Sequence, residues 1–372
     1  MKQDILTIGD ICSRFSSGKN ITSESIHSEG EFPVYGGNGL RGYTDSFNFE
    51  GECSIIGRQG AYCGNVRYFK GKGYMSDHAV VAVTKPEHNN RYFAYKLGLM
   101  NLGRFSGQAA QPGLSVTKVS KLRVEMPPLH VQRRIASILS AYDNLIENNT
   151  RRIRLLEQMA ENIYKEWFVR FRFPGHENAE FENGLPKGWQ TVKLSEYADI
   201  VMGQSPDSQY YNESKIGLPF HQGVGSYGYF YLNDDVYSSQ GKKIAEPNSI
   251  IFSVRAPVGR INITLHRIII GRGVCSINAK DGTNAFLLWL LKDKFSKEDS
   301  IGNGAIFASV TKDELSKQKI LIPDNELLLK FNRIADHLEK QIRLLTSQNH
   351  LLTRQRDLLL PRLMSGKLEV KS

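Results

Sequence analysis

The sequence predicts an α+β protein in which two strand-rich domains form a pseudo-twofold repeat. Two long antiparallel helices, paired as a coiled coil, are expected to separate these domains. The first supporting observation is length, because 372 residues suffice for roughly two domains with sizeable cores. The second is that segments 129–168 and 324–360 contain neither glycine nor proline. The third is a set of short motifs that recur in the same order about half a chain later.

Composition narrows the class of protein. An apolar content of 40% and an aromatic content of 10% argue against a disordered chain. Each of the four cysteines lies at least ten residues from the next, so they form no metal motif or disulfide framework, and we expect a reducing compartment. The first residues lack an apolar signal core, and no run approaches the ~18 apolar residues of a membrane span, which predicts a soluble cytoplasmic protein. The net charge of +10 favours an anionic partner without identifying it.

The two strand-rich domains are expected at residues 1–126 and 186–322. Both are rich in glycine, aromatic and β-branched residues, and short apolar runs alternate with glycine-rich turns. The runs expected to form strands are 54–57, 79–84, 249–254 and 267–270. Basic residues outnumber acidic ones by 15 to 11 in the first domain and by 16 to 13 in the second. This balance is expected if both domains contact one polyanion.

The two helices are expected within 127–173 and 323–372, with an acidic linker at 174–188. Two prolines, at 127 and 128, suit the start of the first helix, and Pro361 is expected to end the second. About 40 helical residues would extend about 60 Å, longer than a compact domain normally houses, which predicts paired, protruding helices. Two ordinary core helices, each containing a break, are the alternative.

Apolar residues recur every three or four positions in both helices, which predicts one apolar stripe on each. The stripe has two possible partners, the other helix or a separate subunit, and Asn149 and Asn349 interrupt it in a way that suits fixing of the register. The residues expected to pack between the helices or to dock a subunit are Ile135, Leu139, Tyr142, Leu145, Asn149, Leu156, Ile334, Leu338, Ile342, Leu345, Asn349 and Leu352.

Four pairs of matching segments indicate an internal duplication. Residues 32–43 match 218–229 at a shift of 186 residues, which is half the chain. The other matches start at Ser54 and Ser249, at Val116 and Val310, and at Arg134 and Arg333, with shifts of 195, 194 and 199. Because the order never changes and the shift varies by small insertions only, the matches favour duplication over chance.

Catalytic chemistry finds little support in the sequence. Both glycine-rich copies spell GxGxxG, but turn and strand formers follow each of them instead of the helix that a dinucleotide site needs. The acids near 207 and 213 could suggest a magnesium nuclease, but they lie too close in sequence to come from adjacent core strands, and the first half has no counterpart. No histidine pair has metal-ligand spacing on a helix, and His78, after Asp77, is typical of a hydrogen-bonded turn histidine. We therefore expect no catalytic residue, no metal and no cofactor in this chain.

The remaining signal is nucleic-acid recognition. Both strand-rich domains interleave basic, amide and aromatic residues with glycines, and the donor geometry of Arg and Gln fits base edges. A solvated face with structural glycines explains any single residue better, so only the set favours DNA. The residues expected to contact DNA are Arg41, Tyr43, Arg58, Gln59, Asn65, Arg67, Arg104, Gln108, Lys118, His221, Gln222, Tyr227, Arg255, Arg260, Arg272 and Lys312.

Several motifs resemble those of type I restriction-modification specificity subunits. They are the run from Met126 to Ala136 with its continuation to Trp167-Phe168, the segment 184–189, the segment 57–64, and the ending 359–368. The resemblance covers nearly the whole chain, and the order of the motifs is specific.

The resemblance implies a division of labour among subunits. In such proteins each recognition domain reads one half of a bipartite, asymmetric DNA site, and the helices fix the gap between the halves. A methylation subunit uses S-adenosylmethionine to modify adenine, and a restriction subunit uses ATP and Mg²⁺, with two copies of each expected. In the second half, Ser253-Val254-Arg255 stands opposite Arg58-Gln59-Gly60, so contact roles do not transfer directly between the halves.

Three other interpretations stay open at this point. The chain could be the specificity subunit of a related system whose single partner fuses the methyltransferase and the nuclease. It could also be a coiled-coil adaptor that binds no DNA, or an enzyme with an unrecognised site. Binding of a methylation subunit and then of DNA would discriminate among them.

Overall fold

The chain folds into two compact units. Unit 1 consists of residues 1–150 and 347–372, and unit 2 of residues 151–346. The structure is a computed structural model, and it describes residues 4–107, 113–295 and 309–370.

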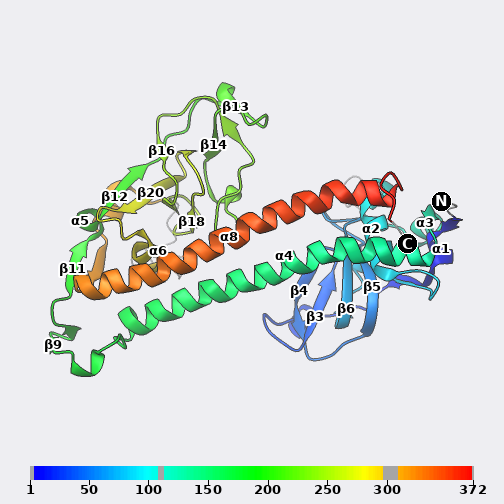
Figure 1. Cartoon of the computed structure of the whole chain (residues 1–372), viewed down its shortest axis with the longest axis horizontal. Helices are drawn as coiled ribbons and strands as arrows, with labels where there is room; N and C mark the ends of the chain where they lie inside the picture. The colour runs from blue at the N-terminus through cyan, green and yellow to red at the C-terminus, as the bar shows by residue number, and fades with distance from the viewer. Residues whose placement is uncertain (1–3, 108–112, 296–308, 371–372) are drawn as a thin grey trace. The chain divides into compact units, whose positions relative to one another are not determined.

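The boundary between the units falls inside both long helices. These are α4 (Leu129–Tyr164) and α8 (Asn325–Met364), drawn in green and orange to red in Figure 1. Each unit therefore contains one strand-rich region and one segment of each helix. No helix in the described ranges is long and apolar enough to cross a membrane.

Unit 1 is built on a six-stranded sheet in the order β2-β7-β5-β6-β3-β4. All neighbours are antiparallel except β3 and β6, which run parallel. Helix α2 (Asn90–Leu99) packs Tyr92 and Phe93 into a core with Ile56 and Val80 of the sheet. The strands are β2 (Cys12–Ser17), β3 (Phe32–Gly36), β4 (Gly39–Thr44), β5 (Phe49–Gly57), β6 (Val66–Met75) and β7 (Ala79–Thr84).

A two-stranded sheet and short helices complete unit 1. The sheet pairs β1 (Asp4–Thr7) with β8 (Arg123–Met126) in antiparallel register. Thr7 and Asp10 form a capping box that starts the first helix. The short helices are α1 (Ile8–Ile11) and α3 (Val116–Ser120), with 3₁₀ turns at Ser23–Ser25 and Leu102–Phe105.

Unit 2 contains a four-stranded sheet in the order β12-β20-β17-β18 and a five-stranded sheet in the order β13-β15-β14-β19-β16. Helix α6 (Asn284–Lys294) is apolar on all sides, and Ala285 to Leu291 are all buried, so it forms the centre of this core. The strands of the two sheets are β12 (Ala198–Met202), β13 (Tyr211–Asn212), β14 (Leu218–His221), β15 (Tyr237–Ser238), β16 (Ile244–Ala245), β17 (Ile250–Ser253), β18 (Ile261–Ile263), β19 (Ile268–Ile270) and β20 (Val274–Ala279).

The periphery of unit 2 repeats that of unit 1. Strand β11 (Gln190–Lys193) pairs with β21 (Lys319–Ile322), as β1 pairs with β8. Helix α5 (Leu194–Tyr197) follows β11 as α1 follows β1, and helix α7 (Lys312–Ser316) precedes β21 as α3 precedes β8. The remaining elements are a π-helical turn at Lys165–Val169, 3₁₀ turns at His176–Asn178, Ser208–Tyr210 and Val224–Ser226, and the hairpin of β9 (Phe181–Glu182) and β10 (Leu185–Pro186). The predicted fold class, including the duplication, is confirmed.

The two helices run antiparallel within each unit. In unit 1, Arg356 of α8 donates to Asp143 of α4 at 2.8 Å, and Leu363 and Met364 share a core with Ile135 and Leu139. The amide of Asn149 donates to Asn349 Oδ1 and to Gln348 Oε1, both at 3.0 Å. These amides satisfy each other beside the apolar seam, which favours this register over a slipped one.

In unit 2, the seam between the helices is aromatic. Tyr164 of α4 contacts Phe331 of α8, with ring centroids 5.8 Å apart, and both rings are buried together with Phe168 and Phe286. Leu338, Ile342 and Leu345 are buried in the same cluster, and Ile334 and Leu156 pack on its edge.

One expectation for the helices needs correction. Pro361 does not end α8, which continues to Met364. Proline removes one backbone donor, but the following turn persists because the Pro361 carbonyl accepts from the Ser365 N–H at 3.1 Å and Leu363 and Met364 are buried. Leu145, expected to pack between the helices or to dock a subunit, is 47% exposed. Tyr142 and Leu352 are half-buried.

Candidate nucleic-acid interface

Three chain segments of unit 1 meet where strand β5 ends. The N–H of Arg58 donates to the carbonyl of His78 at 2.9 Å, and the carbonyl of Arg58 accepts from the N–H of Leu114 at 2.8 Å. The next residue, Gln59, forms an antiparallel bridge with Gly113 and is exposed. We call these five residues the strand-end frame of unit 1. The frame holds the backbone on both sides of Arg58 and leaves the side chain of Gln59 in solvent.

The β3–β4 hairpin brings two arginines close to this frame. A Cβ atom at Gly57 would lie 2.5 Å from the carbonyl oxygen of Gly37, so the hairpin and the end of β5 pack backbone to backbone. Gly39 has φ +97°, and a Cβ there would lie 2.9 Å from Nε of Arg67. Arg67 and Arg41 are both exposed. The glycines therefore allow cationic side chains to gather at one edge of the sheet.

Unit 2 repeats the frame with different residues. The N–H of Val254 donates to the carbonyl of Gly273 at 2.9 Å, and the carbonyl of Val254 accepts from the N–H of Val310 at 2.8 Å. The next residue, Arg255, forms an antiparallel bridge with Ser309 and is exposed. These five residues are the strand-end frame of unit 2.

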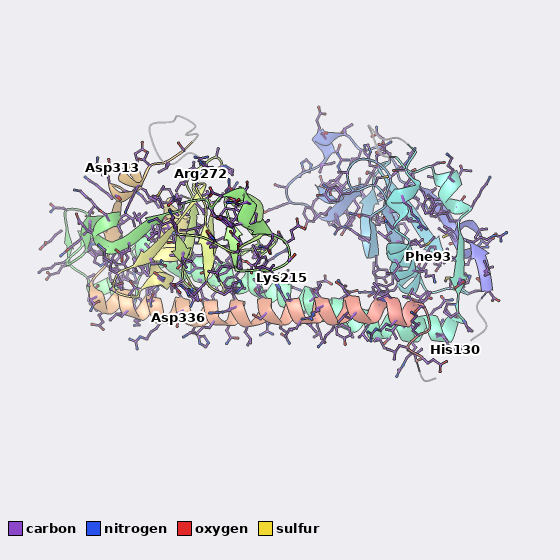
Figure 2. The ribbon with its side chains drawn as sticks, turned by 90° about the horizontal axis from the view of Figure 1, so that it is seen from above. Phe93, His130, Lys215, Arg272, Asp313 and Asp336 are labelled. Atoms are coloured by element: carbon purple, nitrogen blue, oxygen red, sulfur yellow. The ribbon has the colours of Figure 1, made fainter. Side chains whose placement is uncertain are left out.

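Two further predicted residues lie beside the second frame. Strands β14 and β19 are parallel neighbours, and Gln222 and Arg272 come shortly after their carboxyl ends. A Cβ at Gly273 would lie 2.2 Å from the carbonyl oxygen of Gln222, which places this backbone in direct contact with the frame. Figure 2 shows Arg272 on the side of unit 2 away from helix α8, which carries Asp336.

His221 lies inside unit 2 and orders the loop that follows it. The residue is 1% exposed, its Nδ1 lies 2.8 Å from Oγ of Ser226, and its Nε2 lies 3.0 Å from Oδ1 of Asp234. The other carboxylate oxygen of Asp234 lies 2.5 Å from Nε2 of His266, which is exposed. Burial alone would raise the pKa of Asp234, but the hydrogen bond from His221 and the charge of His266 hold this pKa below its usual value.

Comparison with known families assigns this architecture. A family model described as the type I restriction modification DNA specificity domain matches residues 3–158 and 186–354. The chain belongs to this family. The two matched segments correspond to the two copies of the structural repeat. Family membership gives the chain the role of DNA specificity subunit, not that of a catalytic subunit.

Individual relatives agree with this assignment. The chain is 30% identical over 325 residues to a putative type I restriction enzyme specificity subunit, MjaX, of Methanocaldococcus jannaschii, covering 84% of this chain and 76% of the relative. It is 38% identical over 160 residues to the type I restriction enzyme EcoprrI specificity subunit of Escherichia coli, covering 42% of this chain and 40% of the relative. The crystal structure of a type I restriction-modification S subunit from M. genitalium has the same fold, with a TM-score of 0.67, 16% identity and coverage of 100% of this chain and 97% of that one.

The structure of this specificity subunit separates the predicted contact residues into groups. Those at or beside the frames are Arg41, Arg58, Gln59, Arg67, Gln222, Arg255 and Arg272. Asn65 and Arg104 lie near the first frame, since the Asn65 carbonyl accepts from Gly57 at 2.8 Å and a Cβ at Gly64 would lie 2.1 Å from the N of Gly103. Arg260 is close to the second frame, because its N–H donates to Oγ of Ser253 at 2.9 Å.

The other predicted contacts lie elsewhere. Lys118 and Lys312 are exposed on α3 and α7, and Tyr43 is half-buried in β4. The hydroxyl of Tyr227 donates to the carbonyl of Ile251 at 3.3 Å, so its polar end faces the protein. Gln108 lies outside the described residues.

Three residues that hydrogen-bond in the network around His221 were not expected from the sequence. Ser226, Asp234 and His266 build the network around His221, but their spacing of 8 and 32 residues gives no local motif. His78 is a hydrogen-bonded turn histidine as expected, and its Nδ1 lies 2.7 Å from Oε1 of Gln59. Among the described residues, no group of three or more acids, histidines and cysteines could hold a metal ion.

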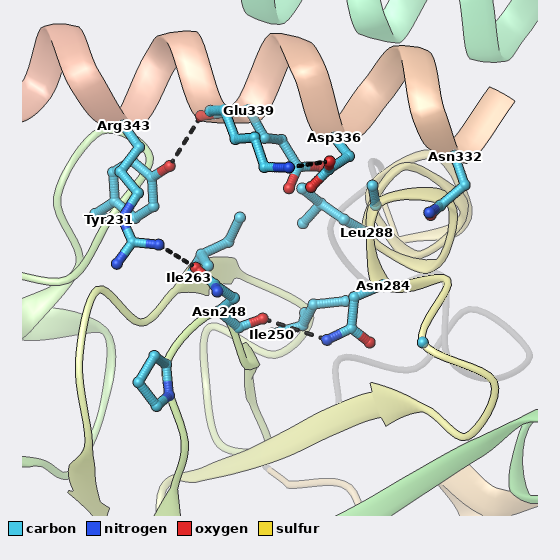
Figure 3. A pocket seen from close by; sticks show the side chains of 14 residues that line it. Tyr231, Asn248, Ile250, Ile263, Asn284, Leu288, Asn332, Asp336, Glu339 and Arg343 are labelled. Atoms are coloured by element: carbon cyan, nitrogen blue, oxygen red, sulfur yellow. Dashed lines mark hydrogen bonds and ion pairs between the residues drawn. The ribbon is translucent and has the colours of Figure 1, made fainter.

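Unit 2 also contains a cavity of about 320 Å³ away from the frame. Figure 3 shows Asp336, Glu339 and Arg343 of α8 facing Asn248, Ile250 and Ile263 across it. The buried Oε1 atom of Glu339 has no hydrogen-bond partner. Burial, together with the negative charge of Asp336, raises the pKa of Glu339 from 4.5 to about 8, against the opposing effect of Lys292.

The buried Glu339 predicts that stability decreases as pH rises. Because the folded protein keeps the proton between pH 4.5 and about 8, where the unfolded chain has lost it, the free energy of unfolding should fall through this window and level off above it. The slope should be on the order of 1 kcal/mol per pH unit. Glu339→Gln should remove this slope and be more stable than the parent at pH 8, measured by chemical denaturation at a series of pH values. The exposed Glu147→Gln is the control, and parallel profiles for Glu339→Gln and the parent would contradict the assignment.

Proposed function

We propose that each unit reads one half of a bipartite, asymmetric site on double-stranded DNA. The observation that carries this proposal is the strand-end frame, which recurs in both units and presents an exposed Gln or Arg beside further arginines. These side chains can bond base edges in the major groove, and nearby cationic groups can bind phosphates. The recognition domains we propose are 1–126 and 186–322, with helical segments 127–173 and 323–372 and a linker at 174–188.

The proposed complex contains further subunits. We propose that this chain assembles in the cytoplasm with two methylation and two restriction subunits. S-adenosylmethionine, ATP and Mg²⁺ are assigned to those partners and not to this chain. The strand-end frames present hydrogen-bond donors that suit base edges, which supports a recognition role for this chain and a catalytic role for its partners.

Helix α8 offers a docking surface for the methylation subunit. Leu344, Leu351 and Leu358 are 63%, 60% and 56% exposed, and their spacing of seven residues places them on one face of the helix. Helix α4 carries a second set of exposed apolar residues, Leu145, Leu155 and Met159. Because such stripes are costly to leave in water, they support a partner with an apolar surface.

Charged residues in the α8 stripe should prevent assembly. Leu351→Glu combined with Leu358→Glu should abolish co-purification of the methylation subunit, while the melting temperature of the isolated chain stays within a few degrees of the parent. His350→Glu, on a neighbouring face of the helix, is the matched control and should retain the subunit. Full retention by the double variant would exclude this docking surface.

Single changes Arg58→Ala and Arg67→Ala should weaken DNA binding by the complex with the methylation subunit. Each arginine that neutralises a phosphate releases a counterion, so its loss should reduce the slope of log affinity against log salt by about 1. Binding titrations at several salt concentrations measure both effects. Arg123→Ala, in β8 of the same unit, should behave as the parent; unchanged affinity and slope for both test variants would remove these residues from the interface.

Lengthening the helices should lengthen the gap in the recognised site. Four residues inserted after Thr150 in α4 and four after Thr346 in α8 add about 6 Å of helix, close to two base pairs of about 3.4 Å each. Methylated sites, mapped by sequencing, should then have a longer gap and unchanged half-sites. Four residues inserted after Asn183, outside the helices, should leave the gap unchanged. An unaltered gap after the helix insertions would rule out the ruler role.

A further inference from the structure

The two strand-end frames are equivalent position by position. The N–H of Arg58 and the N–H of Val254 each donate at 2.9 Å to the carbonyl of the residue that directly precedes a strand, which is β7 in unit 1 and β20 in unit 2. The carbonyls of Arg58 and Val254 each accept at 2.8 Å from the N–H of the residue that directly follows Gly113 or Ser309, the bridge partners of the next residues. The following residues, Gln59 and Arg255, each form the bridge itself. The structural shift is therefore 196 residues, one more than the 195 that the sequence suggests. Gln59 corresponds to Arg255, and not to Val254.

Burial supports this correspondence. Val254 is buried and Arg58 is half-buried, with its guanidinium donating to the carbonyl of Asp77 at 3.3 Å, so both first positions are less exposed than the residues that follow them. Gln59 and Arg255 are both exposed. Each frame thus fixes the backbone through three contacts and presents one polar side chain outward.

The side chain of Gln59 makes a hydrogen bond with His78. Its Oε1 lies 2.7 Å from Nδ1 of His78, and a carbonyl oxygen paired with this nitrogen requires the ring to donate. The second lone pair of Oε1 and both hydrogens of Nε2 stay available. An amide ordered in this way offers one acceptor and one donor side by side, which is the pattern that pairs with N6 and N7 of adenine.

The side chain of Arg255 has a different recognition pattern. The guanidinium offers two parallel donors and no acceptor, which is the pattern that pairs with O6 and N7 of guanine. The side chain is exposed, as are Ala256 and Pro257 beside it. The exposed guanidinium can therefore reach a DNA groove.

We propose that Gln59 and Arg255 are the equivalent specificity-determining residues of the two units, Gln59 reading an adenine in one half-site and Arg255 a guanine in the other. This inference rests on the proposed function, because it requires that both units read DNA. His78 is then a positioning residue that acts through Gln59.

Reciprocal substitutions test the inference. The full chain, in complex with its methylation subunit, is presented with DNA in which every position of both half-sites is randomised, and bound sequences are read out. Gln59→Arg should change adenine to guanine at one position of one half-site, and Arg255→Gln should change guanine to adenine at one position of the other. Each change should alter the ratio of the two bases by about tenfold to a hundredfold, the range expected for a bidentate pair. His78→Phe should lower discrimination at the Gln59 position only.

Lys118→Gln and Lys312→Gln are matched controls, one in each unit. Because these exposed lysines lie on the equivalent short helices α3 and α7, they should lower overall affinity at most and leave every base preference unchanged. If both reciprocal variants keep the parental base preference, the inference is wrong although the proposed function stands. If the parent complex itself selects no bipartite sequence, the proposed function fails first, and the two failures are distinguished.

Discussion

The structure depends on the burial of the apolar stripes of two helices that belong to neither globular half alone. In unit 1, α2 packs on Ile135 and Leu139 of α4 and on Leu363 of α8. In unit 2, the aromatic cluster joins Tyr164 of α4, Phe286 of α6 and Phe331 of α8. Removal of either helix segment would expose these side chains to water, at a cost of roughly 1.5–3 kcal/mol for each large residue. The core of each unit is therefore built in part by both helices.

Much of this architecture is predictable because helical periodicity and internal repetition are properties of the sequence itself. The apolar spacing in 129–168 and 324–360 locates both helices, and runs such as 79–84 coincide with strands. Residues such as Leu145 show the limit of that approach, since periodicity places it on the stripe without showing whether it packs inside the chain, and only the structure reveals that it is exposed. The end of α8 was misjudged for a similar reason, because tertiary burial of Leu363 and Met364 outweighs the missing donor of Pro361.

The interface was less accessible to sequence reasoning, since its geometry depends on backbone hydrogen bonds that carry no residue signature. Arg58 and Val254 share no chemistry, yet they occupy the same place in the two frames. His221 shows the complementary difficulty. A histidine beside Gln222 in a glycine-rich segment looks the same in sequence whether its ring contacts DNA or lies in the core, and here both ring nitrogens face Ser226 and Asp234.

The division of the chain has a consequence for its synthesis. Unit 2 is one continuous stretch, 151–346, whereas unit 1 joins the first 150 residues to residues 347–372. Because the core of unit 1 includes Leu363 and Met364, it cannot close while the ribosome is still translating the second repeat. The core of unit 1 is thus completed only after the whole of unit 2 has been synthesised.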